Sequence, residues 1–218
     1  LDGINKIFQQ KIDELRDLLL IEKDNIYKLN ISSLISLENL EIILFEILKP
    51  FGFSEVNQVI KAINSQSGKK FFSSNYQLII DREEVVISFL EENKDDVEIL
   101  AIETKIKNPL SIEFSVSSNL SFDNDPNRAK LDFHKLSFPL KLRKWKNGDK
   151  FKPLGMSNFK KLSDFFIDEK YSLLEKQKQW ILCSEDNIVW IVGNRIDERY
   201  KIETHTKKVY IAELLKED

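Results

Sequence analysis

The sequence predicts an α+β fold, with an N-terminal helical subdomain followed by a mixed, β-rich α/β part. Two observations lead to this prediction. Apolar residues recur at steps of three and four through the first 66 residues, which is typical of helices that pack on a core. After Gly68 the spacing changes to two, and turn residues separate many short apolar runs, which is typical of strands and hairpins.

Three helices are predicted in the N-terminal part. The first has an apolar stripe formed by Ile4, Ile7, Phe8, Ile12, Leu15, Leu18 and Leu19. The second covers residues 37–48, with Ser36 as its N-cap and Pro50 just after its end, and the third covers 55–63. The segment 26–34 between the first two has no clear period, and its structure stays open.

The rest of the chain is predicted to form short strands, turns and two short helices. Strands or hairpins are expected over residues 76–87, 99–116, 131–138, 140–144, 181–192 and 208–214. The two helices are expected over 162–169 and 173–179. Asn147-Gly148-Asp149 predicts a tight turn, because Asn and Gly adopt a positive φ more readily than other residues.

The composition is that of an ordinary globular chain, with 42% hydrophobic and 32% charged residues among 218. No apolar run approaches the roughly 20 residues that a membrane span needs, so no membrane partner is expected. The lone Cys183 cannot form an internal disulfide and is expected to be buried and inert. With no signal peptide visible, we expect a cytoplasmic protein. The chain begins with Leu1, and we expect it to be part of a longer protein.

The charges are distributed unevenly along the chain. The net charge is −3, yet residues 141–161 alone have a net charge of +7, which leaves −10 for the rest. The cations of this segment are Lys141, Arg143, Lys144, Lys146, Lys150, Lys152, Lys160 and Lys161, and Trp145, Phe151 and Phe159 lie between them. Cationic side chains bind phosphates, and aromatic rings stack on unpaired bases. This combination of residues therefore favours RNA binding by the segment. The simpler alternative is a solvated surface of a lysine-rich protein.

The predicted turn after residue 146 has a consequence for these cations. If the chain reverses there as a hairpin, Lys150 and Lys152 come back beside Lys144 and Lys146. About six cations in contact with phosphates would give a log–log salt slope of about −4 to −5 for RNA binding.

Three motifs in this part of the chain resemble one family. They are Arg143-Lys-Trp-Lys-Asn-Gly-Asp-Lys-Phe-Lys-Pro-Leu-Gly-Met156, Lys160-Lys-Leu-Ser-Asp-Phe-Phe-Ile-Asp168 and Ile188-Val-Trp-Ile-Val-Gly-Asn-Arg-Ile-Asp-Glu-Arg199. In this order and spacing they resemble the C-terminal domain of tRNA(Ile)-lysidine synthases. Gln66-Ser-Gly-Lys69 and Tyr76-Gln-Leu-Ile-Ile-Asp-Arg82 are similar to the stretch that follows the helical linker of these enzymes. The resemblance covers about residues 66–88 and 141–200.

The resemblance implies a function for the longer protein and a smaller one for this chain. Members of the family use ATP, with magnesium, to adenylate the wobble cytidine of the isoleucine tRNA anticodon, and then attach lysine to form lysidine. This carbon–nitrogen ligase chemistry belongs to an N-terminal PP-loop domain with an S-G-G-x-D-S motif, which this sequence lacks. We therefore expect this part to bind the isoleucine tRNA on the acceptor-stem side, to hold no cofactor and not to catalyse by itself. Its other expected partner is its own PP-loop domain.

The resemblance also implies three segments and two sets of residues. The segments are a helical linker or substrate-recognition subdomain over 1–68, a small antiparallel β-rich segment over 69–138 and a tRNA-binding domain over 139–218. The expected tRNA contacts are Arg143, Lys144, Lys146, Lys150, Lys160, Lys161, Arg195 and Arg199. The expected structural residues are Gly148, Asp149, Pro153, Gly155, Trp190 and Gly193.

The residues themselves refine some of these roles. Asp149 is expected to bond the turn backbone or to hold a nearby arginine. Trp180 and Trp190 are expected in the core, Trp190 because its apolar neighbours alternate, whereas the place of Trp145 stays open.

Other kinds of site find little support. His134 and His205 lie far apart in the sequence with a single cysteine, so no metal site is expected. No serine or pair of carboxylates has the spacing of a catalytic group, and an independent hydrolase has no motif to support it. The main alternative is a protein-interaction module, in which Ile4, Phe8 and the rest of the first apolar stripe dock the catalytic domain or a second copy as a homodimer.

Overall fold

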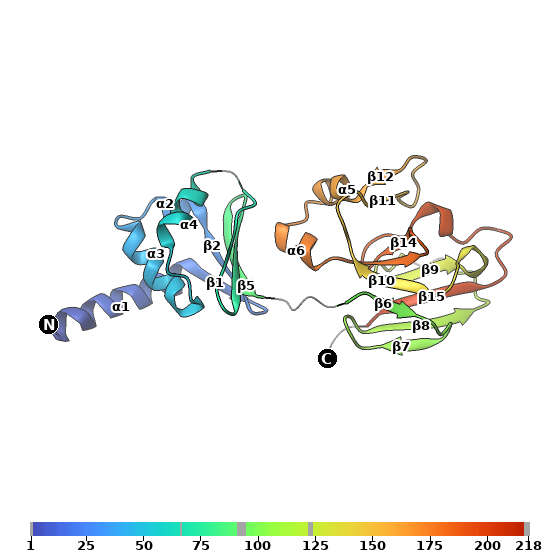
Figure 1. Cartoon of the computed structure of the whole chain (residues 1–218), viewed down its shortest axis with the longest axis horizontal. Helices are drawn as coiled ribbons and strands as arrows, with labels where there is room; N and C mark the ends of the chain where they lie inside the picture. Colours follow the sequence, from blue (N-terminus) through green and yellow to red (C-terminus); the bar gives the residue numbers. More distant parts are fainter. Residues whose placement is uncertain (1, 66, 91–94, 122–123, 216–218) are drawn as a thin grey trace. The chain divides into compact units, whose positions relative to one another are not determined.

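The computed structural model describes residues 2–65, 67–90, 95–121 and 124–215. The chain divides into two compact units, Leu1–Glu92 and Asn93–Asp218 (Figure 1). Each unit combines antiparallel sheets with helices, which confirms the predicted α+β class.

Unit 1 is a five-stranded sheet with helices packed on one face. The order is β1-β2-β5-β4-β3, and all neighbours are antiparallel. The strands are β1 (Leu20–Lys23), β2 (Ile26–Asn30), β3 (Lys70–Phe72), β4 (Tyr76–Asp81) and β5 (Glu84–Phe89). The helices are α1 (Asp2–Leu19), α2 (Ile31–Ile35), α3 (Leu40–Leu48) and α4 (Val56–Ile63). Alternate residues of β4 and β5, such as Leu78 and Ile87, meet Leu44 and Val59 of the helices in one core.

The structure resolves the ambiguous segment and corrects part of the helical prediction. Residues 26–34, whose structure the sequence left open, form β2 and then α2. Strands β1 and β2 form a hairpin in a part of the chain for which only helices were predicted. Asp24 and Asn25 form its turn with φ values of 53° and 58°. Asp and Asn both tolerate a positive φ, so Asp24-Asn25 could have been recognised in the sequence as a hairpin turn.

Unit 2 contains two four-stranded sheets and a small two-stranded one. The first has the order β14-β13-β10-β6 and the second β7-β8-β15-β9, while β11 pairs with β12. The strands are β6 (Val97–Ile99), β7 (Thr104–Ile106), β8 (Ile112–Ser117), β9 (Arg128–Asp132), β10 (Leu140–Lys144), β11 (Lys150–Phe151), β12 (Lys160–Lys161), β13 (Trp180–Ser184), β14 (Asn187–Ile191) and β15 (Val209–Leu214). The helices are α5 (Leu162–Asp168) and α6 (Leu173–Lys178).

The sheet that contains β13 is covered on both faces. Trp180 and Leu182 point into a core shared with the second sheet, where Tyr210 and Phe114 lie. Ile181 and its neighbours on the opposite face pack with α5 and β11 in a separate core. Alternation along each strand separates the two cores, and Trp180 and Trp190 are buried as the spacing predicts.

The two units do not coincide with the three predicted segments. Strand β2 pairs with β5, so residues on both sides of position 68 belong to one sheet. Strands β6 and β9 pair with β10 and β15, so the later part of 69–138 belongs to unit 2. The division therefore lies at 92/93 instead of 68 and 138, because strand pairing joins segments that differ in local pattern.

Candidate nucleic-acid interface

A tight turn after β10 positions the predicted basic segment. Gly148 has φ of 94°, as expected, and the Asp149 carboxylate accepts a hydrogen bond of 2.7 Å from the Lys146 backbone N–H. The same carboxylate accepts two bonds of 2.9 Å from Nη1 and Nη2 of Arg143. Asp149 thus bonds the turn backbone and also holds an arginine, which were the two roles expected for it.

This ion pair is well shielded from solvent, since the Arg143 and Asp149 side chains are 13% and 15% exposed. Burial alone would raise the pKa of Asp149, but the hydrogen bonds from Arg143 and Lys146 outweigh it and lower that pKa below its usual value. The bond to Asp149 likewise raises the pKa of Arg143. Arg143 therefore fixes the turn and has few donors left for a phosphate.

A second carboxylate fixes the other side of the segment. Asp197 is fully buried and accepts hydrogen bonds from the backbone N–H of Lys152 at 2.8 Å and from Nε and Nη2 of Arg199, both at 2.9 Å. Arg199 also donates to Asn187 Oδ1 at 2.8 Å. Sequence reasoning missed Asp197, although an acid two positions before an arginine was a usable signal.

Between these anchors, residues 146–161 form what we call the basic hairpin. Strands β11 and β12 place Lys150 opposite Lys161 and Phe151 opposite Lys160. Lys150 and Lys152 do not return beside Lys144 and Lys146, so that prediction was wrong. The physical reason is that β11 pairs with β12 in a separate two-stranded sheet, whereas β10 pairs with β13 and β6.

The eight predicted contact residues fall into two groups. The first group has internal partners: besides Arg143 and Arg199, Lys144 donates to the Lys178 carbonyl at 2.8 Å and Lys160 pairs with Asp168. The second group points outward, and its members are Lys146, Lys150, Lys161 and Arg195. Among the residues that the structure describes, the three lysines of this second group have no ion pair.

One aromatic side chain of the basic hairpin is exposed. Phe159 is 54% exposed and lies between two cations, with Lys150 Nζ at 5.6 Å and the Arg199 guanidinium at 4.9 Å from its ring centroid. Trp145 is different, because its indole N–H donates to the Lys176 carbonyl and its ring packs edge-on against Phe166. Phe159 is therefore the residue of this hairpin that can stack on a base.

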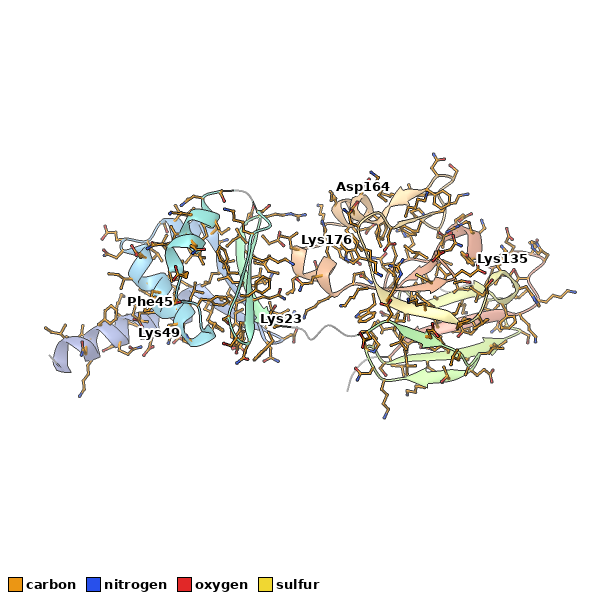
Figure 2. The ribbon with its side chains drawn as sticks, in the orientation of Figure 1. Lys23, Phe45, Lys49, Lys135, Asp164 and Lys176 are labelled. Carbon is orange, nitrogen blue, oxygen red and sulfur yellow. The ribbon has the colours of Figure 1, made fainter. Side chains whose placement is uncertain are left out.

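Acidic residues border the basic hairpin on the side of α5. Asp164, Asp168 and Glu169 are all exposed there, and Figure 2 shows Asp164 pointing away from the body of unit 2. Asp168 holds Lys160, and Glu169 lies 4.0 Å from Arg195. These acids thus limit the positive surface of the hairpin on the side of α5.

The described residues offer few other groups for metal binding or catalysis. Across the described ranges, no group of three or more His, Cys, Asp or Glu residues could hold a metal ion. Likewise, no helix in those ranges is long and apolar enough to cross a membrane. Cys183 is buried, and burial raises its pKa to about 11, which leaves it an unreactive thiol. His134 and His205 both lie at the surface.

Comparison with known proteins gives a consistent result. Residues 22–91 match the model of the TilS substrate binding domain, and residues 140–213 match that of the TilS substrate C-terminal domain. The tRNA(Ile)-lysidine synthase of Parabacteroides distasonis is 36% identical over 99% of this chain and 50% of its own length. That of Bacteroides thetaiotaomicron is 30% identical over 99% and 48%.

Among solved structures, a TilS C-terminal domain aligns with 56% of this chain and all of its own, at 18% identity and a TM-score of 0.48. The chain spans about half the length of the curated relatives it matches. The two family matches fall one in each compact unit, the first ending next to the division at 92/93. On the two family models and these relatives, the chain belongs to the tRNA(Ile)-lysidine synthase family, in the region of its substrate-binding and C-terminal domains.

Proposed function

We propose that unit 2 binds tRNA through the basic hairpin and takes no direct part in catalysis. The observation that carries the proposal is that Lys146, Lys150 and Lys161 are exposed on the same anchored hairpin as the exposed ring of Phe159, with Lys150 Nζ 5.6 Å from that ring. Phosphates supply most of the affinity in such an interface, and a ring can stack on an unpaired base.

Within the whole protein, the proposed reaction is the family's conversion of the wobble cytidine of the isoleucine tRNA to lysidine, with lysine and ATP. The groups that would bind ATP and magnesium belong to a PP-loop domain outside this chain. In this arrangement the present chain holds the tRNA on its acceptor-stem side, in the cytoplasm, while the catalytic domain acts on the anticodon.

The acidic background of the chain supports a single orientation of the RNA. Outside residues 141–161 the net charge is −10, and acids of α5 border the hairpin directly. Like charges repel over about 8–10 Å at ordinary ionic strength, so phosphate is disfavoured on most other surfaces. The hairpin is therefore where a polyanion meets the least repulsion.

Salt dependence of tRNA affinity tests this proposal. With three to four cations in contact with phosphates, the slope of log affinity against log salt is expected to be about −3 to −4. This is shallower than the slope expected from charge counting alone, because several cations have internal partners. A slope near zero, or no binding at low salt, would rule out the proposal.

A second candidate role concerns α1. Its first half carries Ile4 and Ile7, which are 71% and 72% exposed, whereas Ile12 is buried against the body of unit 1. Figure 1 shows the N-terminal end of α1 extending beyond the other helices of this unit. An exposed apolar stripe favours docking of the catalytic domain or of a second copy.

Light scattering distinguishes a second copy from a monomer. If α1 mediates a homodimer, the chain has twice the monomer mass and Ile4→Glu with Ile7→Glu restores the monomer mass. A monomer at all concentrations would leave the catalytic domain as the proposed partner of α1.

A further inference from the structure

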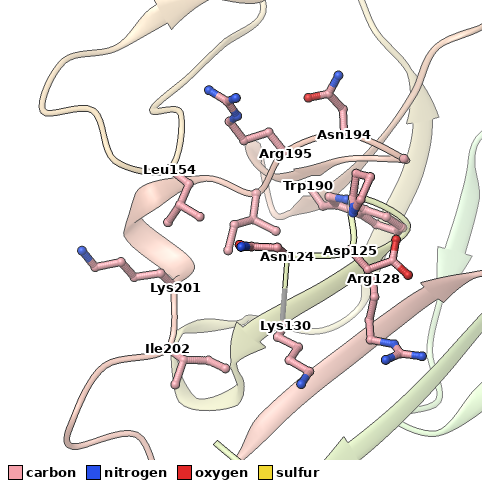
Figure 3. A pocket seen from close by; sticks show the side chains of 13 residues that line it. Asn124, Asp125, Arg128, Lys130, Leu154, Trp190, Asn194, Arg195, Lys201 and Ile202 are labelled. Atoms are coloured by element: carbon pink, nitrogen blue, oxygen red, sulfur yellow. The ribbon is translucent and has the colours of Figure 1, made fainter. Parts of the chain in front are cut away.

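Unit 2 contains a cavity that the proposed hairpin contacts do not use. Its volume is about 640 Å³, within the approximate 300–1,000 Å³ range of small-ligand sites. It lies between the segment 193–202, residues 124–126 just before β9, and Leu154 of the basic hairpin (Figure 3). All these elements belong to one compact unit, so the cavity is part of a single folded body.

The lining combines an apolar floor with polar and cationic edges. Leu154, Ile196 and Ile202 contribute apolar surface above the buried Trp190. Asn124 contributes an amide and Asp125 a carboxylate. In Figure 3, Arg195 lies above Asn124 and Lys201 lies to its left, on different sides of the opening. An apolar surface, an amide and cations at the edge are the groups that recognise the planar base, the base edge and the phosphate of a nucleotide.

The cations of the edge differ in their partners. Arg128 pairs with Glu213 at 2.5 Å, Lys201 pairs with Glu198 and Lys130 donates to the Ser121 carbonyl at 2.8 Å. Arg195 is 41% exposed, and its nearest carboxylate, in Glu169, is 4.0 Å away. Arg195 is therefore the best placed of these cations to hold a phosphate at the cavity.

The cavity is connected directly to the proposed RNA surface. The backbone N–H of Leu154 donates to the Ile196 carbonyl at 3.1 Å, and that of Gly155 donates to Glu198 Oε2 at 2.8 Å. The hairpin that presents Lys150 and Lys161 thus also forms a wall of the cavity. The lysines and this wall of the cavity therefore belong to one segment of the chain.

We infer that this cavity takes one unpaired nucleotide of the bound RNA, with its base against Leu154 and its phosphate at Arg195. This inference rests on the proposed function, because the hairpin must first bind the RNA. A base inside a duplex is stacked and paired and cannot enter, whereas an unpaired base beside a duplex end can. The apolar floor favours a nucleotide over an inorganic anion, which would leave that floor unfilled.

The test compares two RNAs on the full chain by fluorescence anisotropy at one salt concentration. One is a short stem-loop with a blunt end, and the other has the same stem with a few unpaired nucleotides at its 3′ end. We expect the second RNA to bind about tenfold more tightly, a typical gain for one well-placed base. Asn124→Glu should reduce this preference to about twofold or less while leaving the blunt RNA nearly unaffected. Arg195→Gln should reduce the preference to the same extent, in addition to any loss of affinity that both RNAs share, because Arg195 is also one of the outward cations.

Both substitutions are at solvent-accessible side chains, and thermal unfolding of the variants checks that the fold is kept. Lys207→Gln, which removes an exposed cation that does not line the cavity, is the control and should keep the tenfold preference. Equal affinity of the wild type for both RNAs would overturn the inference, as would variants that weaken both RNAs equally. Absence of binding to either RNA would instead overturn the proposed function, and the inference with it.

Discussion

Strand β10 and the basic hairpin are neighbours in the chain and both contain several cations, but these cations differ in their partners and burial. In β10, Lys141 pairs with Asp96 at 3.0 Å and Arg143 is held by the Asp149 carboxylate. In the hairpin, Lys150 and Lys161 lie opposite each other and are exposed. The net charge of a segment shows where cations are concentrated in the sequence. Burial and the internal partners of each side chain decide which of these cations can bind a phosphate.

The position of each element explains the difference. β10 is an inner strand of a sheet that is covered on both faces, so its polar side chains need internal partners. The hairpin has two residues in each strand and is anchored to the body through Phe151 and the segment 152–155. The side chains of Lys146, Lys150 and Lys161 project into solvent, where cations need no partner.

The largest expected effect concerns the anchor of the hairpin. Asp197→Ala leaves Arg199 and the Lys152 N–H without their acceptor, so the free energy of unfolding should fall by about 3 kcal/mol. Urea unfolding measures this loss, and Asp186→Ala, an exposed acid in a nearby turn, is the control, with an effect within about 0.5 kcal/mol. A loss below about 1 kcal/mol would show that Asp197 does not hold the hairpin.

The next effect concerns RNA affinity. Reversing the three outward charges, Lys146→Glu, Lys150→Glu and Lys161→Glu, should weaken tRNA binding by about 100-fold because each lost contact is replaced by repulsion. The thermal unfolding midpoint should hardly change. The matched control reverses Lys105, Lys107 and Lys207, three exposed lysines elsewhere in unit 2. If both triple variants lose the same affinity, net charge matters and the hairpin has no special role.

A smaller effect is expected at the turn, and it depends on pH. The folded pKa of Asp149 lies below its unfolded value, so its ion pair stabilises the fold above the unfolded pKa and this contribution is lost as pH falls through the folded pKa. Asp149→Asn should cost about 2 kcal/mol at neutral pH and progressively less below about pH 4. Urea unfolding at several pH values checks this. A difference that is constant with pH would mean that the charge of Asp149 contributes nothing.

The smallest effect is expected in β10 itself. Lys144→Gln removes a hydrogen bond to the Lys178 carbonyl and a cation 4.7 Å from the Trp180 ring, so stability should fall by about 0.5–1 kcal/mol. The tRNA affinity should stay within about twofold. A tenfold loss of affinity would place Lys144 among the RNA contacts and would contradict the comparison.

Local sequence pattern predicted much of unit 2 but not its strand pairing. The strand 140–144, both short helices and the last strand lie close to where they were expected, because period and turn chemistry are local. Which strands pair is a long-range property, and nothing local indicates that β6 pairs with β10 or that β9 pairs with β15. For this reason residues before 138 share a compact unit with the C-terminal segment, although the C-terminal family match begins at residue 140, next to the predicted boundary.

The sequence predicted which segment contains the candidate site, but not which of its side chains are exposed on the surface. The turn at Gly148 and the role of Asp149 follow from residue type, so sequence reasoning anticipated them. The partner of Arg199 is the buried carboxylate of Asp197 two residues earlier, and the partner of Lys160 lies on the following helix. Side-chain partners depend on packing, so the charge count predicted more free cations than the structure provides.

The salt slope of tRNA binding, measured on the wild type and on the triple neutral variant Lys146→Gln, Lys150→Gln and Lys161→Gln, tests the central claim most directly. Each phosphate contact contributes about 0.9 to the slope, so we predict that neutralising the three lysines makes it shallower by about 2 to 3. An unchanged slope would contradict the account, because phosphate contacts would then lie outside the basic hairpin.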